Sequence, residues 1–234
     1  DTDGALNPGI GTLAKLWDIG GEHPRVPRKA EIKEALTKID DSQITLQKHT
    51  VVTNPDQVQV DLGAVGKGIA ADHVMEFLKE ETSIQGGIVS VGGSLCVYGE
   101  KDDGSDWEVG VQDPRGKTGE MAGSVTVPAD SFVSTSGDYE KYIEQDGKRY
   151  HHILDSKTGY PSQSGLISVT IVSESGIDSD ALSTACFVLG IKKSLLLLEK
   201  YQAEAVFIDQ DHNIYLTDGV KFELKNADDY QLKE

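Results

Sequence analysis

The sequence is poor in positive charge. Lys and Arg number 22 against 39 Asp and Glu, which gives a formal net charge of −17 at pH 7. A surface this acidic repels the phosphate backbone of DNA or RNA, so we expect no nucleic-acid partner. No apolar run in the 234 residues approaches the roughly 20 needed to cross a bilayer. We therefore expect no transmembrane segment in this chain.

Several common catalytic and metal-binding motifs are also missing. The two cysteines, Cys96 and Cys186, are far apart and form no CxxC pair, and the six histidines include no HExxH. No GxSxG nucleophile elbow occurs. These absences argue against a zinc protease or a serine hydrolase. Two buried thiols are the simplest interpretation of the cysteines, with one disulfide as the alternative.

The remaining composition is that of a globular protein. Hydrophobic residues make up 38% and charged residues 26%, which is enough for a core. Apolar spacing predicts helices over 12–17, about 26–39, 69–79, 178–189 and 191–201, and strands over 44–46, 51–52, 58–62, 87–91, 95–98, 107–111, 124–127, 166–172, 205–208 and 214–216. Short turns between strands favour an α+β fold, a single domain over 1–234 with mixed, largely antiparallel sheets and packed helices.

A glycine-rich segment is the first candidate for chemistry. It reads Asp61-Leu-Gly-Ala-Val-Gly-Lys-Gly68 and leads from a predicted strand into a predicted helix. Backbone N–H groups at such a turn can bind an anion, Lys67 adds positive charge, and Asp61 can accept hydrogen bonds. The pattern is neither a P-loop nor GxGxxG. A glycine-rich turn without a ligand is the alternative.

A helical acid with two hydroxyls is the second candidate. Asp180, Ser183 and Thr184 are spaced i, i+3 and i+4, so their oxygens share one face of the predicted helix. One carboxylate among oxygen ligands suits Mg²⁺, which takes further ligands from phosphates and water. The alternative is a helical turn with a capping acid and two ordinary hydroxyls.

Two further segments carry polar groups. His151 and His152 are adjacent, so in a strand they point to opposite faces, and one of them could move a proton near neutral pH. One exposed histidine and one hydrogen-bonded core histidine is the alternative. A turn is predicted over 155–159, with Gly159 at positive φ. The run 134–139 is either a hydroxyl-rich ligand loop or a capping turn.

Five motifs in a fixed order resemble one family. Together they are similar to the FAD:protein FMN transferases, or ApbE-type flavin-trafficking proteins, over nearly the whole chain from Gly4 to about Ile208. The motifs are Asp61-Leu-Gly-Ala-Val-Gly-Lys-Gly68, Ser90-Val-Gly-Gly-Ser94, Thr135-Ser-Gly-Asp-Tyr139, His152-Ile-Leu-Asp-Ser-Lys-Thr-Gly-Tyr-Pro161 and Asp180-Ala-Leu-Ser-Thr184.

The resemblance implies a reaction. With Mg²⁺, the family splits the pyrophosphate of FAD and attaches FMN through a phosphoester to a threonine of an acceptor flavoprotein, releasing AMP. Some members instead hydrolyse FAD to FMN and AMP, so an FAD pyrophosphatase is the alternative. A flavin-binding protein without turnover is the second alternative.

The resemblance also implies roles for residues. The family often has a carboxylate where Ser183 stands, and usually Phe-Asp where Leu6-Asn7 stands. A hydroxyl at position 183 leaves less charge to hold the ion. The implied metal ligands are the main-chain carbonyl of Ala64 with Asp180, Ser183 and Thr184; the implied catalytic residue is His152; and the implied nucleotide contacts are Ala5, Leu6, Asn7, Asp61, Lys67 and Leu154.

Location and length follow from the same resemblance. Family members are generally exported, so we expect an extracytoplasmic protein at the bacterial cell surface or in the periplasm, with a lipid anchor in many members. They usually carry a further N-terminal portion before the Gly4-Ala-Leu-Asn7 segment, and part of it helps enclose FAD. The expectation is therefore an N-terminally shortened chain.

Overall fold

The computed structural model describes residues 1–54, 56–81 and 83–233. These fall into two compact units, each built from two separate stretches of chain. The first unit comprises residues 1–63 and 138–163, and the second comprises 64–137 and 164–234. The prediction of one domain over 1–234 is not tested by this division and stays a prediction.

The second unit is built on a large sheet. Its described residues form seven strands in the order β14-β12-β11-β10-β7-β4-β3, with every neighbouring pair antiparallel except β12 and β14. A second sheet has the order β13-β6-β5. The strands are β3 (Gly86–Val91), β4 (Ser94–Gly99), β5 (Trp107–Gln112), β6 (Met121–Val127), β7 (Ser131–Gly137), β10 (Leu166–Ser173), β11 (Glu204–Asp209), β12 (Asn213–Leu216), β13 (Lys221–Leu224) and β14 (Gln231–Lys233). The predicted α+β class with largely antiparallel sheets is confirmed.

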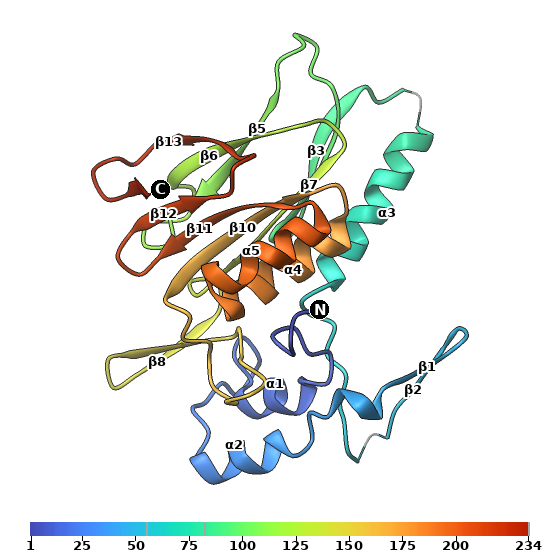
Figure 1. Cartoon of the computed structure of the whole chain (residues 1–234), viewed down its shortest axis with the longest axis vertical. Helices are drawn as coiled ribbons and strands as arrows, with labels where there is room; N and C mark the ends of the chain where they lie inside the picture. Colours follow the sequence, from blue (N-terminus) through green and yellow to red (C-terminus); the bar gives the residue numbers. More distant parts are fainter. Residues whose placement is uncertain (55, 82, 234) are drawn as a thin grey trace. The chain divides into compact units, whose positions relative to one another are not determined.

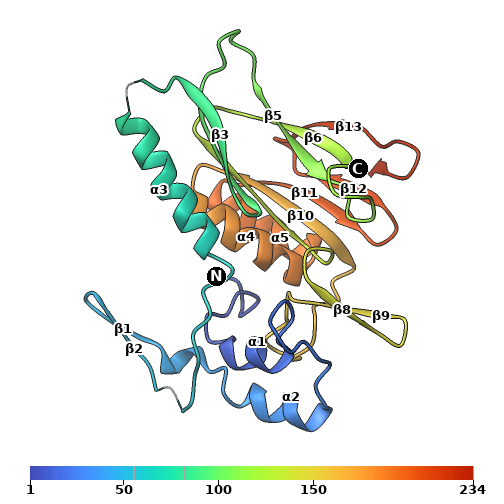
Figure 2. The same cartoon turned by 180° about the vertical axis from the view of Figure 1, so that it is seen from behind.

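The two faces of the large sheet have different neighbours. On β7, Val133 belongs to an apolar cluster with Val109 and Val125 of the second sheet, whereas the adjacent Ser134 contacts helix α4. Alternating strand residues point to opposite faces, so the second sheet and α4 cover opposite sides. The helices of this unit are α3 (Gly66–Glu80), α4 (Gly176–Leu189) and α5 (Ile191–Tyr201), seen from two sides in Figures 1 and 2.

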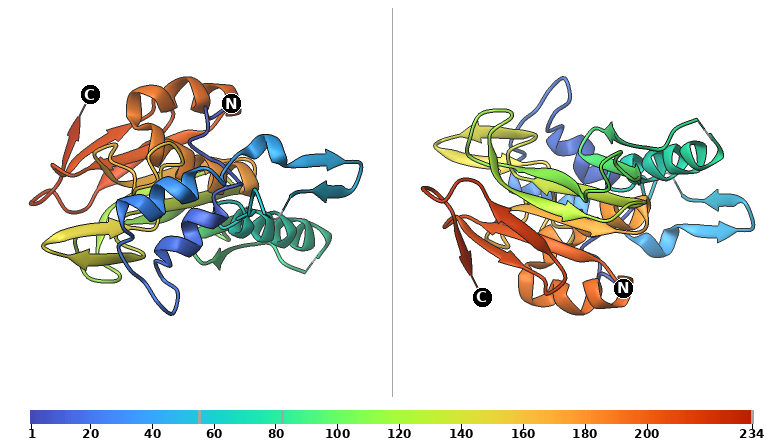
Figure 3. Two further views of the ribbon diagram at one scale, coloured as in Figure 1. Left: turned by 90° about the horizontal axis from the view of Figure 1, so that it is seen from below. Right: turned by 90° about the horizontal axis from the view of Figure 1, so that it is seen from above.

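The first unit is smaller and packs around an indole ring. Trp17 is fully buried and donates from Nε1 to the carbonyl oxygen of Gly159 at 2.9 Å. Its ring contacts those of Tyr150 and Tyr160, with centroids 5.7 and 5.9 Å away. Figure 3 shows its helices and hairpins from above and below. The elements are α1 (Gly11–Trp17), α2 (Lys29–Leu36), the 3₁₀ turn η1 (Asp41–Gln43), and the hairpins β1 (Thr45–Gln47) with β2 (Thr50–Val52) and β8 (Tyr142–Gln145) with β9 (Lys148–His151).

The strand predicted over 58–62 does not form. Val58 pairs only with Ile39, and Gln59 only with Ile10, as single bridges. Ile10 leads directly into α1, and Ile39 follows α2, so neither neighbour stays extended long enough to build a ladder. The alternating residues indicated an extended chain correctly, but the described residues place no strand beside it.

A buried carboxylate ties the C-terminal segment to the second sheet. Asp113 follows β5 and is buried; it accepts hydrogen bonds from Tyr230 Oη at 2.5 Å, from the N–H groups of Arg115 and Gly116, and from Asn226 Nδ2. Burial alone would raise the pKa of Asp113, but these donors outweigh it and lower the pKa below its usual value. Burial and the Asp113 charge both raise the pKa of Tyr230.

This pair makes stability depend on pH at both ends. A carboxyl with a lower pKa in the folded state stabilises the protein above its unfolded pKa, about 3.9, and that contribution is lost as pH falls. A phenol with a raised folded pKa stabilises below its unfolded pKa, about 10, and that contribution is lost as pH rises.

Tyr230→Phe is therefore expected to cost about 1–3 kcal/mol of unfolding free energy at pH 7, because Asp113 loses a buried donor. The loss should shrink as pH falls towards 3. Urea unfolding at several pH values measures both effects. Tyr142→Phe, at an exposed tyrosine, is the control; equal losses in the two variants would contradict this account.

Candidate active site

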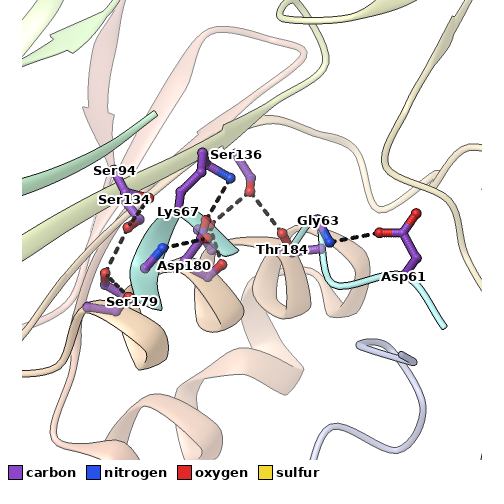
Figure 4. Close-up of polar contacts among 12 residues, drawn as sticks. Asp61, Gly63, Lys67, Ser94, Ser134, Ser136, Ser179, Asp180 and Thr184 are labelled. Atoms are coloured by element: carbon purple, nitrogen blue, oxygen red, sulfur yellow. Dashed lines mark hydrogen bonds and ion pairs between the residues drawn. The ribbon is translucent and has the colours of Figure 1, made fainter. Parts of the chain in front are cut away.

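Asp180 is the centre of the polar cluster in the second unit. It lies on α4 and is 1% exposed. Its Oδ1 is 2.9 Å from Lys67 Nζ, and its Oδ2 accepts a hydrogen bond from the Gly68 N–H at 3.0 Å. Figure 4 shows both contacts reaching Asp180 from the start of α3. A buried carboxylate is stable only with such partners, so these contacts fix the first turn of α3 against α4.

The two predicted hydroxyls lie one turn further along α4. Ser183 donates to the carbonyl oxygen of Asp180 at 2.8 Å, and Ser136 Oγ lies 2.8 Å from Ser183 Oγ and 3.2 Å from Thr184 Oγ1. Since the Ser183 proton goes to the carbonyl, Ser136 donates to Ser183, and Thr184 donates to Ser136. Ser183 is fully buried, whereas Thr184 is partly exposed. Thr184 is thus the hydroxyl better placed to meet a ligand from solvent.

Close backbone contact brings α3 and α4 together. A Cβ on Gly68 would lie 2.2 Å from the carbonyl oxygen of Gly176, and a Cβ on Gly176 would lie 2.5 Å from that of Gly68. Asp72 then accepts hydrogen bonds from the N–H groups of Gly176 and Ile177 at 2.6 and 2.9 Å. A carboxylate at a helix start complements the helix dipole. These contacts fix the distance at which Lys67 meets Asp180.

The segment 134–139, predicted as a loop or turn, is largely a central strand. β7 runs from Ser131 to Gly137 between β4 and β10. Ser134 bonds to Ser94 of β4 at 2.9 Å and to Ser179 of α4 at 2.7 Å. Small hydroxyls let α4 lie close to the strand while every polar atom in this set finds a partner. The roles of Ser134, Ser136 and Ser179 were not predicted; their signal in the sequence is a run of small polar residues.

The oxygen ligands of the proposed metal site suit a hard cation, but they are few and include one carboxylate. Asp180, Ser183 and Thr184 offer only oxygen, with one carboxylate, and the described residues contain no group of three or more His, Cys, Asp or Glu able to hold an ion. Ala64, the fourth predicted ligand, lies two residues before α3. Such a set suits Mg²⁺ only when phosphate oxygens and water complete the shell. The protein alone supplies little charge for the ion.

The predicted nucleotide contacts of the first unit form a second cluster. Asn7 bonds through Nδ2 to the carbonyl oxygen of Ile39 and through Oδ1 to the N–H of Gly9. Asp61 accepts from the Gly63 N–H at 2.7 Å and donates from its own N–H to the carbonyl oxygen of Pro8. Hydrogen bonds thus hold Asp61 beside the segment that contains Ala5 and Leu6.

The same segment is tied to the predicted turn after the histidines. Ser156 Oγ donates to the carbonyl oxygen of Gly4 at 2.6 Å, and the Gly159 N–H donates to that of Asp155 at 2.8 Å. Gly159 has φ +73°, which confirms the predicted positive φ, and a Cβ there would lie 2.5 Å from Ile32 Cγ2. Leu154 is buried and pairs with Pro161. The Ser156 hydrogen bond therefore holds this turn beside residues 4–7.

His151 and His152 differ in burial, as expected of adjacent residues that point to opposite faces. His151 is buried and lies with Nε2 3.1 Å from the carbonyl oxygen of Ser162. His152 is partly exposed, with Nδ1 3.3 Å from the carbonyl oxygen of Lys141. A carbonyl only accepts, so this contact places the proton on Nδ1 and makes Nε2 the basic nitrogen of the neutral ring.

The predicted site residues thus lie in two groups. Lys67, Ala64, Asp180, Ser183 and Thr184 belong to the second unit, and the other predicted residues to the first. The first unit also has a hollow of about 620 Å³ whose lining includes Lys15, Arg25 and Glu31 but none of the predicted site residues.

The cysteines take no part in either group. Cys96 and Cys186 are both buried and free, so the disulfide alternative is wrong and the simpler prediction is confirmed. Burial raises the pKa of each thiol to about 11. They are neutral and unreactive at physiological pH.

Comparison with known proteins identifies the family behind these groups. The chain is 38% identical to the FAD:protein FMN transferase of Treponema pallidum over 233 residues, covering 93% of this chain and 64% of that protein. It is 36% identical to a Klebsiella pneumoniae protein of the same name, covering 92% of this chain and 66% of that one. The chain therefore spans slightly less than two thirds of these curated relatives.

Solved structures give the same result. The crystal structure of the ApbE protein of Thermotoga maritima matches with a TM-score of 0.80 and 36% identity, over 95% of this chain and 70% of that one. The apo form of the Pseudomonas stutzeri flavinyl transferase ApbE matches with a TM-score of 0.74 and 32% identity, over 97% and 69%. The sequence profile of the ApbE family covers residues 1–207. The resemblance of the five motifs is confirmed, and the chain belongs to the ApbE family.

Proposed function

We propose that this chain is an FAD:protein FMN transferase. It cleaves the FAD pyrophosphate, attaches FMN through a phosphoester to a threonine of an acceptor flavoprotein, and releases AMP. The observation that carries the proposal is the buried Asp180, flanked by Ser183 and Thr184 and paired with Lys67, in a chain of the ApbE family. The names of the relatives from Treponema pallidum and Klebsiella pneumoniae support it.

The second unit would bind the pyrophosphate and its ion. Asp180, Thr184, Ser183 and the Ala64 carbonyl would hold a Mg²⁺ ion, and Lys67 would contact phosphate. A bound Mg²⁺ neutralises charge on the departing AMP phosphate. The Gly68 N–H holds Oδ2 of the Asp180 carboxylate in position.

The first unit would bind the rest of the nucleotide and activate the acceptor. Residues Ala5 to Asn7, Asp61 and Leu154 are the proposed contacts of FAD. His152 would accept the proton of the acceptor threonine at Nε2, since Nδ1 is held by the Lys141 carbonyl. The threonine oxygen then forms the new bond to the FMN phosphorus while the bond to the AMP phosphate breaks.

His152→Ala is expected to lower FMN transfer about 100-fold or more, the usual contribution of a general base, while FAD affinity changes little. Transfer rates and FAD binding by flavin fluorescence separate the two effects. His73→Ala, at an exposed histidine of α3, is the control. Parallel loss of transfer and of FAD binding would show that His152 is structural.

The cleavage half of the proposal can be tested without an acceptor. The protein is incubated with FAD and Mg²⁺, and AMP is measured by chromatography with and without EDTA. Metal-dependent AMP release is the expected result. FAD that stays intact at saturating Mg²⁺ would contradict the proposed cleavage.

We also propose that the protein acts outside the cytoplasm, at the cell surface or in the periplasm, with a lipid anchor as in many ApbE-type proteins. None of the helices in the described chain is both long and apolar enough to cross a membrane. Fractionation of the native host with an antibody to this chain tests the proposal, and recovery in the cytoplasmic fraction alone would contradict it.

A further inference from the structure

The proposed metal site already contains a cation of the protein itself. Lys67 Nζ lies 2.9 Å from Asp180 Oδ1, and the Asp180 side chain is 2% exposed against 36% for Lys67. The other carboxylate oxygen accepts the Gly68 N–H. Figure 4 shows the ammonium group of Lys67 directed at Asp180. Each oxygen of the only carboxylate in the proposed ligand set is therefore engaged.

The charge of this set sums to zero. Asp180 carries −1 and Lys67 carries +1, while Ser183, Thr184 and the Ala64 carbonyl are neutral. A divalent cation that approaches the set meets no net negative charge, and it meets an ammonium at the oxygen it needs. Ser183 is a hydroxyl and adds no negative charge to the set.

The position of Lys67 is held by its surroundings. It is the second residue of α3, and a Cβ on Gly92 would lie 3.2 Å from Lys67 Cδ. Gly92 lies between β3 and β4 with φ +62°. The Gly92 turn thus packs on the lysine stem, while the Lys67 side chain as a whole remains partly exposed to solvent.

We propose that Lys67 is an internal counter-cation that keeps divalent ions from Asp180 until a nucleotide phosphate takes the ammonium. The inference rests on the proposed function, because it names the pyrophosphate as the anion. Once Lys67 pairs with phosphate, Asp180 and the pyrophosphate together provide the negative charge for the ion. Metal and nucleotide binding are then positively coupled, and linkage makes that coupling equal in both directions.

The first test uses the metal alone. Mn²⁺, followed by electron paramagnetic resonance, is titrated into the folded protein without FAD. Lys67→Met is expected to bind Mn²⁺ about 10-fold more tightly than the wild type, a typical coupling between sites. Lys67→Gln keeps a hydrogen-bond donor for Asp180 Oδ1 but removes the charge, so it should also bind Mn²⁺ more tightly than the wild type. It serves as the second variant if Lys67→Met fails to fold.

Two controls separate this effect from a general change in charge. Lys79→Met, on the same helix and paired with Asp130 at 3.5 Å, should leave Mn²⁺ affinity unchanged. Adding Asp180→Asn to Lys67→Met should remove the gain. Equal affinities in the wild type and both Lys67 variants, or no Mn²⁺ binding by any of them, would overturn the proposal. No FAD is present, so this result is independent of whether the chain turns FAD over.

The second test uses FAD in EDTA, followed by flavin fluorescence. Lys67→Met should bind FAD about 10-fold more weakly, because a charge-assisted phosphate contact is lost. Opposite changes in metal and FAD affinity are the signature of the counter-cation. Weakening of both would indicate a merely structural lysine and would overturn the proposal.

Discussion

Asp180→Ala is expected to lower metal-dependent FAD cleavage about a thousandfold or more. The substitution removes the only carboxylate of the proposed ligand set, and metal assistance is worth several kcal/mol in phosphoryl transfer. The Gly68 N–H also loses its acceptor. AMP release over a range of Mg²⁺ concentrations, including saturation, measures the effect.

Asp178→Ala is the matched control for that substitution. Asp178 lies on the same helix, carries the same charge and is outside the ligand set. It should cost only the few tenths to 1 kcal/mol of stability that an acid in the first turn contributes, with cleavage nearly unchanged. Wild-type cleavage by Asp180→Ala at saturating Mg²⁺ would remove Asp180 from the proposed site.

Gly68→Ala is expected to lower the stability of the second unit by about 1–3 kcal/mol, because overpacking against backbone is not easily relieved. The new Cβ would lie 2.2 Å from the carbonyl oxygen of Gly176 and 2.8 Å from Asp180 Cβ. The helices must then separate, which draws Lys67 away from Asp180. Thermal unfolding should show a drop of several degrees, with loss of FAD cleavage.

Gly66→Ala tests whether the loss of stability depends on the position in α3 or on replacing a glycine at all. Gly66 begins the same helix, and a Cβ there would meet nothing within 4 Å. Alanine is the better helix former, so this variant should be as stable as the wild type or slightly more stable. Similar melting temperatures for the two variants would show that the close approach of α3 and α4 is not required.

The sequence predicted elements well where apolar residues repeat at a clear period. The helices α3, α4 and α5 and strands such as β3, β5 and β10 lie where the pattern placed them. β7 was missed because Ser134 and Ser136 read as loop residues, although hydrogen bonds to α4 satisfy them inside the protein. The strand predicted over 58–62 did not form for the opposite reason: its alternating pattern is right, but within the described part of the chain no strand pairs with it.

The sequence predicted which residues of the candidate site share one helix, but not which elements contact each other there. Helical spacing predicted that Asp180, Ser183 and Thr184 share one side of a helix; all three lie on α4, where Ser136 contacts the two hydroxyls. The contacts of Asp180 with Lys67 and Gly68 join residues more than 100 positions apart, and they depend on two glycines that allow α3 and α4 to touch. Such a contact follows from tertiary packing, which local patterns do not encode.

Intact-mass analysis of an acceptor tests the central claim most directly. The protein is incubated with FAD, Mg²⁺ and an acceptor domain that carries the threonine motif, and the acceptor is then weighed by mass spectrometry. The proposal predicts a mass gain equal to FMN less one water, absent in EDTA and with Asp180→Ala. An unmodified acceptor in a reaction that accumulates FMN and AMP would contradict it and would show an FAD pyrophosphatase instead.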